Sequence, residues 1–332
     1  MTSFHPYIIR SVCRLFCTAI ISLTVSAAQA QYRSIYEIQY TAAADGGSPY
    51  HGQLLNCSGG VVAYKMVRTV PRLVLHDPAH PDGWGGIQVK DRYNLTNYFD
   101  GIEVGDWVEL QNVQVEDHRG TTFLQILKVN NPILTVVSRG HPVPAGLLLD
   151  PNEIAAPLPD AYGDYYVADH AAEKYESMLV RVANVQVARM GLGKAQDNYE
   201  LCSLENPTCC WAADYYNDDL EAFALYYDGV ESGQKLCVVE GMLEQYKNIS
   251  TGFDYYQLMT LCADHLQFPS PADVNDDCAV DMLDYAIFSG FWLEPGCGSS
   301  PVCVRLDCNQ DTILDLVDLA SFVNEWLDGA GE

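Results

Sequence analysis

The chain is poor in basic side chains, with 18 lysines and arginines against 44 aspartates and glutamates in 332 residues. Its formal net charge is −26. Proteins that bind nucleic acids draw most of their affinity from lysine and arginine side chains that neutralise phosphates. The sequence contains no basic patch of this kind, and it therefore predicts no nucleic-acid ligand.

The short motifs of common catalytic sites are also missing. The sequence has no G-x-S-x-G nucleophile elbow, no H-E-x-x-H zinc helix and no G-x-x-x-x-G-K phosphate loop. Their absence favours a non-catalytic protein. Two alternatives stay open: a divergent secreted hydrolase that acts on polysaccharide or nucleic acid, and a structural cell-surface module.

Long apolar runs are confined to the first 30 residues, so no later segment is expected to span a bilayer. In that first segment Arg10 and Arg14 precede the apolar run LFCTAIISLTVSA, and the small residues AQA end at Ala30. This order is typical of a secretory signal peptide over residues 1–30, cleaved after Ala30. A membrane anchor is the rival, but the run is short for one. The mature protein is predicted to be secreted, periplasmic or on the cell surface.

Cysteine usage agrees with export. Two of the twelve cysteines fall in the signal segment. Of the other ten, six lie before residue 270 and four lie after it, so each part holds an even number. These ten are Cys57, Cys202, Cys209, Cys210, Cys237 and Cys262, then Cys278, Cys297, Cys303 and Cys308. Even counts in an oxidising compartment favour disulfides over free thiols, although spacing does not fix the pairing. A zinc site is the alternative, but no C-x-x-C pair is present.

The most informative pattern is an acidic loop that occurs twice, as DVNDDCAVDMLD from residue 273 and as DCNQDTILDLVD from residue 307. Oxygen-bearing side chains stand at positions 1, 3, 5, 9 and 12 of each copy, which is the spacing of an EF-hand calcium loop. They are Asp273, Asn275, Asp277, Asp281 and Asp284, then Asp307, Asn309, Asp311, Asp315 and Asp318. Position 7 would contribute only its backbone carbonyl, from Ala279 and from Ile313. A solvated acidic loop is the alternative for one copy, but two copies favour two calcium ions.

The repeat continues beyond the loops with the same offset of 34 residues. In each copy an apolar stripe at helical spacing follows the loop. The stripes are Ala286, Phe288 and Trp292, then Ala320, Phe322 and Trp326. One short helix cannot bury such a stripe alone, so the two helices are expected to pack against each other.

Two loop–helix units, each without the helix that precedes the loop in an ordinary EF-hand, resemble a type I dockerin over about residues 271–328. This resemblance implies a small calcium-folded module that binds a cohesin-type domain on a scaffold or surface protein, often in polysaccharide-degrading systems. The same ten side chains would be the calcium ligands. Position 6, usually glycine, is Cys278 in one loop and Thr312 in the other. Positions 10 and 11, which are polar and read the cohesin in many dockerins, are apolar here: 282–283 and 316–317.

The part before the break FPSPAD, at residues 268–273, has strong strand signals. In DWVELQNVQVED and MLVRVANVQVAR the alternation of apolar residues slips by one position, at 111–112 and at 183–184, which indicates β-bulges. Two five-stranded barrels are predicted. Their strands lie near 52–64, 72–77, 85–90, 104–117 and 121–129, and near 175–190, 197–204, 208–214, 233–246 and 254–263.

Five bulged strands per barrel match the OB-fold plan. The order of these segments resembles the tandem OB-like modules of bacterial secreted proteins, over about residues 34–268. The expected organisation is a first barrel at 31–131, a connector and second barrel at 132–268, and the dockerin-like domain at 269–332. The predicted fold class is mostly β with a small helical calcium-binding module.

Two groups of residues are candidate ligand sites in the barrels. His76, Asp77, His80 and Asp82 lie close together, and a solvated turn is favoured there over a metal site. The paired tyrosines at 215–216, 226–227 and 255–256 could stack on sugar rings, but residues adjacent on a strand face opposite ways, and core packing is favoured. The sequence therefore predicts an exported adaptor, tethered by calcium-dependent docking to a cohesin-type partner, with a glycan as a possible ligand.

Overall fold

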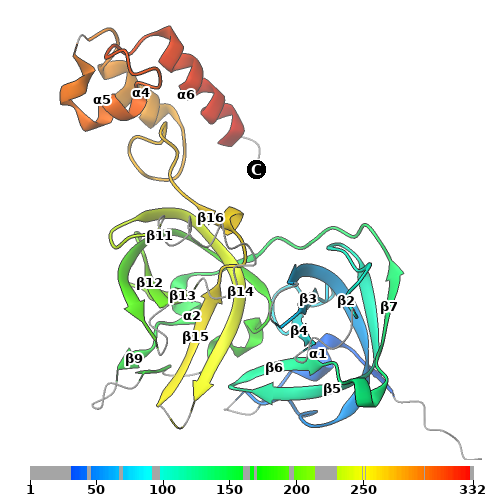
Figure 1. The fold of residues 1–332 in the computed structure, drawn as a ribbon. Coiled ribbons are helices and arrows are strands. Elements are labelled where there is room, and N and C mark those ends of the chain that lie inside the picture. The colour runs from blue at the N-terminus through cyan, green and yellow to red at the C-terminus, as the bar shows by residue number, and fades with distance from the viewer. Residues whose placement is uncertain are drawn as a thin grey trace, which may run out of the picture.

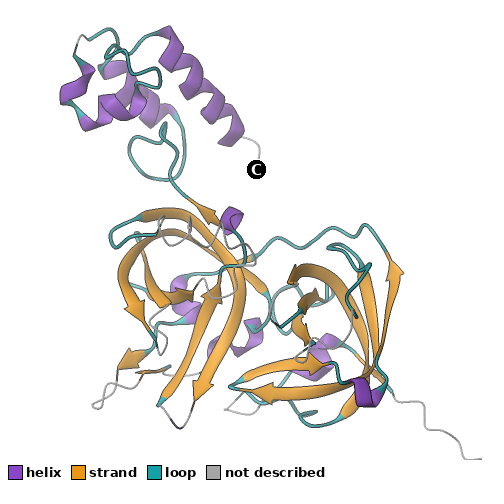
Figure 2. Ribbon diagram, viewed as in Figure 1, coloured by secondary structure: helices purple, strands orange, loops and turns teal. Residues whose placement is uncertain are grey.

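The computed structural model describes residues 31–42, 46–66, 70–91, 98–159, 165–167, 170–193, 198–213, 230–248, 250, 252–294 and 296–329. Figure 1 shows two strand-rich bodies side by side and a group of helices beyond the second. Figure 2 shows the same division, with strands in both bodies and helices near the C-terminus. The described chain is mostly β, as predicted. The expected signal peptide lies outside the described residues.

The first body is a seven-stranded sheet with the order β1-β2-β3-β4-β6-β5-β7. Pairing between β2 and β5 closes five of these strands into a barrel. The elements are β1 (Tyr32–Arg33), α1 (Ile35–Gln39), β2 (Leu54–Met66), β3 (Arg72–His76), β4 (Gly86–Lys90), β5 (Trp107–His118), β6 (Thr121–Gln125), η1 (Lys128–Asn130) and β7 (Ile133–Ser138). The closed order β2-β3-β4-β6-β5 is that of an OB-fold barrel.

The second body repeats this plan, because β11, β12, β13, β15 and β14 close through the pairing of β14 with β11. The elements are β8 (Leu147–Leu148), α2 (Pro151–Ile154), β9 (Leu158–Pro159), β10 (Tyr165–Tyr166), η2 (Ala171–Tyr175), β11 (Leu179–Leu192), β12 (Asn198–Ser203), β13 (Cys209–Ala213), β14 (Lys235–Asn248), β15 (Phe253–Met259), η4 (Ala263–His265) and β16 (Leu266–Gln267). All ten predicted barrel strands are present, each within four residues of its expected bounds.

The predicted slips of phase are visible in the burial of β5 and β11. In β11, Val180 and Val182 and then Val185 and Val187 are all fully buried in one core. Asn112 and Asn184 stand at the two slips with φ of 56° and 50°. Asparagine tolerates this left-handed backbone better than most residues, so it can turn the strand without losing the core face.

The connector after residue 131 differs from the prediction, which gave it no strand. There β7 pairs with Trp107–Gln111 of β5, the half of that strand that β6 does not reach. Further on, β8 pairs with β11. Backbone groups on a strand edge need partners, and an apolar segment that runs alongside can supply them even without clear alternation.

The two barrels share a core. Residues of β2 and β3, among them Met66 and Val74, join Leu179, Met242 and Met259 of the second barrel in one buried cluster. Polar contacts surround it. The Tyr64 hydroxyl donates to the Leu261 carbonyl at 2.8 Å, and the Thr121 hydroxyl donates to the Gln245 carbonyl at 2.9 Å. The two barrels are therefore packed as one unit.

The C-terminal part holds α4 (Met282–Gly290), η5 (Cys297–Ser299), α5 (Pro301–Leu306) and α6 (Leu316–Gly329). Its core is aromatic: Phe288 of α4 and Phe322 of α6 are buried with ring centroids 5.4 Å apart. Trp292 and Trp326 pack against them. The two repeated helices therefore bury their stripes against each other, as expected.

Two details of the repeat were predicted wrongly. Ala286 and Ala320 are exposed, and Ile287 and Leu319 pack on the core in their place, because the helix turns the alanines away from the partner. In addition, the short helix α5 directly precedes the second loop. Ser300 caps it by accepting the Cys303 N–H, and Pro301 suits its first turn.

Candidate metal centre

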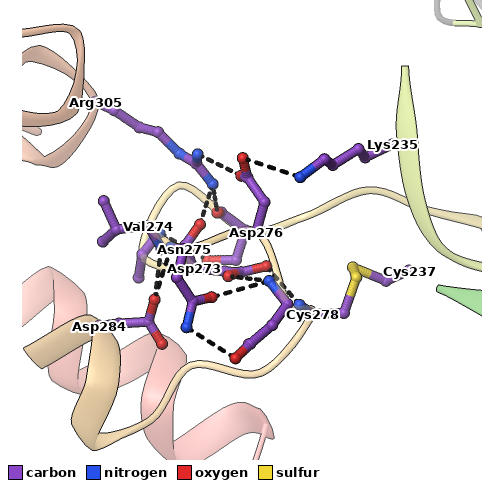
Figure 3. A network of polar contacts seen from close by, with 12 residues as sticks. Lys235, Cys237, Asp273, Val274, Asn275, Asp276, Cys278, Asp284 and Arg305 are labelled. Carbon is purple, nitrogen blue, oxygen red and sulfur yellow. Dashed lines mark hydrogen bonds and ion pairs between the residues drawn. A yellow bond between two sulfur atoms is a disulfide. The ribbon is translucent and has the colours of Figure 1, made fainter. Parts of the chain in front are cut away.

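The first acidic loop is organised around the carboxylates of Asp273 and Asp284. Asp273 accepts the backbone N–H groups of Asp277 and Cys278 at 3.1 and 2.9 Å. Asp284 accepts those of Val274 and Asn275 through one oxygen at 2.7 and 3.1 Å. The chain is thus coiled around its own acidic side chains, as Figure 3 shows.

The second loop repeats this pattern at positions 1, 2, 5, 6, 9 and 12, although the bond from the position-3 N–H to position 12 is found, among the described residues, only in the first loop. Asp307 accepts the N–H groups of Asp311 and Thr312 at 3.1 and 2.8 Å. Asp318 accepts the N–H groups of Cys308 and Asp315 at 2.9 and 3.0 Å. Because a hydrogen-bond pattern this specific recurs at an offset of 34 residues, the two loops have the same conformation.

Positions 3, 5 and 9 make matching short turns in both loops. The amide oxygen of Asn275 accepts the Asp277 N–H at 2.9 Å, and that of Asn309 accepts the Asp311 N–H at 3.0 Å. Position 5 accepts the N–H of position 7: Asp277 from Ala279 and Asp311 from Ile313. Position 9 caps the following helix: Asp281 accepts the Leu283 N–H and Asp315 the Val317 N–H.

Positions 4 and 6 of both loops have left-handed backbone. Asp276 and Cys278 have φ of 58° and 69°, and Gln310 and Thr312 have φ of 58° and 70°. Position 6 is usually glycine because glycine adopts this conformation without steric cost. The departures from glycine at Cys278 and Thr312 therefore leave the sharp turn in place.

The carboxylates of the first loop converge. Asp273, Asp277 and Asp284 each place one oxygen within 4.8 Å of the others, and Asp273 and Asp284 are buried. Burial raises the pKa of Asp273, and the charges of Asp284 and Asp277 add to the rise. Carboxylate and amide oxygens in this number are the ligands that calcium prefers. The donor set thus fits calcium, whose positive charge would offset the repulsion between these carboxylates.

Three disulfides are present among the described residues: Cys202–Cys209, Cys237–Cys278 and Cys297–Cys303. The second joins β14 to the first acidic loop, and this link across the boundary was not expected from counting cysteines in each part. Cys57 and Cys210 are buried thiols, and burial raises the pKa of each to about 12. Such thiols are inert.

The expected turn is present between β3 and β4, where Asp82 is exposed, but His76 is not solvated as predicted. His76 is a buried residue of β3, and burial lowers its pKa to about 4. Asp77 accepts the Ala79 N–H at 3.0 Å, and the His80 ring packs edge-on against Tyr36. These side chains are not gathered as a metal-binding group within the described ranges.

The tyrosine pairs are tested only at 255–256, because the other two lie outside the described residues. Tyr256 is in the core of the second barrel, whereas Tyr255 contacts Trp211 outside that core, with ring centroids 5.0 Å apart. Both tyrosines are buried. Core packing, rather than ligand stacking, accounts for this pair in the structure.

The outer face of β3 and β4 is covered by the second barrel. Arg72 lies 3.8 Å from Glu244, and the Gln88 amide donates to the Ser177 hydroxyl at 3.4 Å. Gln88 is completely buried. The second and third barrel strands form the usual ligand face of an OB-fold. In the first barrel this face is therefore occupied by an intramolecular contact, which sequence reasoning did not detect.

No family model matches the chain, and no curated protein does. Among solved structures, a murine DNA-binding protein bound to double-stranded DNA is similar at 12% identity, 62% coverage of this chain, 93% of that chain and a TM-score of 0.28. A fission yeast Pot1 structure with single-stranded DNA is similar at 12% identity, 69% and 83% coverage and a TM-score of 0.28. In the described part of the chain, no helix combines the length and apolar character needed to cross a membrane.

Proposed function

We propose that residues 269–332 form a dockerin-type module that binds two calcium ions and tethers the exported chain to a cohesin-type partner. The observation that carries this proposal is the identical coil of the two acidic loops, in which each position-1 carboxylate accepts the N–H groups of positions 5 and 6. A coil of this shape points oxygens at positions 1, 3, 5, 9 and 12 toward one centre.

The surface at positions 10 and 11 supports docking. Met282 and Leu283 are 60% and 61% exposed, and Leu316 and Val317 are 71% and 53% exposed. Each repeat thus exposes an apolar pair at the same place, and a partner would cover such side chains. We define these four residues as the docking face. Because they are apolar, the partner surface would be apolar as well.

The two barrels serve as a non-catalytic scaffold in this proposal. The outer face of the first barrel is used for contact with the second, so a glycan or other ligand would bind on the second barrel or on loops. The acidic composition argues against nucleic acid as that ligand. Turnover of a polysaccharide or nucleic acid by the purified mature protein would refute the non-catalytic assignment.

Calcium binding is tested by calorimetry on the mature protein, residues 31–332. The expected stoichiometry is two ions per chain, with magnesium a poor substitute because it demands a smaller, octahedral shell. The paired substitutions Asp273→Ala and Asp307→Ala should abolish binding. As a control, Glu294→Gln changes an exposed carboxylate of the same module that lies outside both loops, and two ions should still bind. A wild-type protein that binds no calcium contradicts the proposal.

Docking is tested on a panel of cohesin domains in calcium and in chelator. Leu283→Asp combined with Val317→Asp should weaken binding at least tenfold, since charges would then face an apolar partner surface. Calcium stoichiometry serves as the control, because neither residue is a ligand. Equal binding by the double variant and the wild type would exclude the docking face.

A further inference from the structure

The first acidic loop is attached to the second barrel by a disulfide, and among the described residues the second loop has no equivalent bond. Cys278, at position 6, forms a disulfide with Cys237 of β14, with Cα atoms 5.3 Å apart. Lys235, two residues earlier on β14, places its Nζ 3.6 Å from Asp276 at position 4. Figure 3 shows both contacts reaching the loop from the same strand. A covalent and an ionic link therefore converge on one turn.

The attached turn also carries a link to the second repeat. Arg305 of α5 places Nη1 2.6 Å from Asp276, and its Nη2 donates to the carbonyl of Ser270 at 2.7 Å and to that of Asp273. Asp276 thus pairs with cations from the barrel and from the helical part, as Figure 3 shows. The first loop is the joint between the barrel pair and the module.

The two loops provide an internal comparison. Cys278 and Thr312 have nearly equal φ, 69° and 70°, and both donate N–H to the position-1 carboxylate, at 2.9 and 2.8 Å. Their backbone geometry is therefore the same. Only Cys278 carries a cross-link, since threonine has no thiol. Any difference in affinity that depends on the Cys237–Cys278 bond must therefore come from the first loop.

We propose that the Cys237–Cys278 disulfide preorganises the first loop for calcium, so that this loop binds calcium more tightly than the second and couples calcium occupancy to the attachment of the module. The inference rests on the proposed calcium binding. A cross-link to a rigid strand removes alternative conformations of the empty loop, and binding no longer has to order them. This matters at position 6, where a residue other than glycine resists the left-handed turn.

The test uses mature protein with one loop disabled. Asp307→Ala with Asp318→Ala leaves only the first loop, and Asp273→Ala with Asp284→Ala leaves only the second. Calorimetry on each gives one dissociation constant. The first-loop protein should bind more tightly. If neither protein nor the wild type binds calcium, the proposed function and this inference fail together.

The cross-link is then removed by Cys237→Ser with Cys278→Ser in both backgrounds. Affinity of the first loop should fall on the order of tenfold, and that of the second loop should stay within twofold. The control is Cys202→Ser with Cys209→Ser, which removes the β12–β13 disulfide and should change neither affinity. If calcium still binds but the first loop is unchanged without its cross-link, the inference is overturned while the proposed function stands.

A second measurement needs no variant. Dithiothreitol gives two electrons and two protons to the disulfide, which becomes two thiols, while the reagent becomes its cyclic disulfide. Coupling is reciprocal, so saturating calcium should shift the Cys237–Cys278 reduction equilibrium toward the disulfide by the same roughly tenfold factor. Alkylation and mass spectrometry report each pair, with Cys202–Cys209 as the internal reference. An equal shift of both pairs, or no shift of Cys237–Cys278, would refute the coupling.

Discussion

Glu173 of η2 should make the folded protein less stable as pH rises from about 4.5 to 8. Its side chain is buried, and the Tyr256 hydroxyl donates to it at 2.7 Å. Burial raises the pKa of Glu173 to about 8; the charges of Asp117 and Asp254 also raise it, whereas the Tyr256 bond and Lys247 lower it. Burial likewise raises the pKa of its neighbour Glu176, and the charge of Glu173 adds to that rise.

The direction of this pH dependence follows from the number of protons bound by the folded and unfolded states. Between pH 4.5 and 8 the folded state keeps the Glu173 proton and the unfolded state releases it, so the stability gained at low pH is lost as pH rises through this window. The pKa of the unfolded glutamate is 4.5 and that of the folded one about 8. At ~1.4 kcal/mol per pH unit, Glu173 alone changes the free energy of unfolding by at most about 5 kcal/mol.

Urea denaturation of mature protein in saturating calcium, at pH 5, 6, 7 and 8, measures this change. Glu173→Gln cannot titrate but can still accept the Tyr256 hydroxyl, so its stability should vary less with pH than that of the wild type, with Glu176 contributing the variation that remains. Glu231→Gln, at an exposed carboxylate, is the matched control and should follow the wild type. If Glu173→Gln and wild type show the same pH dependence, Glu173 is ionised in the folded protein and the reasoning is wrong.

Three further outcomes are expected. Phe288→Ala should destabilise the helical part by about 3–5 kcal/mol, since its ring is fully buried; a lower melting temperature by circular dichroism checks this, and an unchanged one contradicts it. Chelation should lower helix content at 222 nm once disulfides are reduced, because a module this small cannot bury enough core alone; equal spectra in calcium and chelator would exclude metal-dependent folding. Mature protein should not bind duplex DNA at ~150 mM salt by fluorescence anisotropy; salt-sensitive micromolar binding would reveal a basic groove.

Local features of the fold were accessible from sequence because they depend on near neighbours. The alternation of apolar and polar residues along β5 and β11 predicted both strands and both phase slips, since apolar side chains must stay on one face of a barrel wall. The spacing of carboxylates likewise gave the two loops, whose internal hydrogen bonds join residues at most ten positions apart. The connector strand β7 was missed because an edge partner needs no periodic pattern.

Contacts between distant segments were not accessible. The buried cluster that contains Val74 and Met242 and the disulfide between Cys237 and Cys278 join residues whose sequence positions carry no mutual signal. The same applies to Glu173, which looks like an ordinary surface glutamate in sequence. Its burial follows from the packing of two barrels, which no local pattern specifies.

One sequence feature could have indicated the attachment of the first loop to the second barrel: the departure from glycine at position 6 of that loop. A glycine is expected at position 6, and cysteine there is unfavourable unless its thiol does something that glycine cannot. The second loop has threonine in the same place, so cysteine is not needed for the turn. A cysteine that replaces a favoured glycine in one of two equal loops therefore indicates a bond to another part of the chain, and Cys237 provides it. The docking face lies outside that bond, with Leu283 and Val317 both more than half exposed, so the attachment leaves it accessible to a partner.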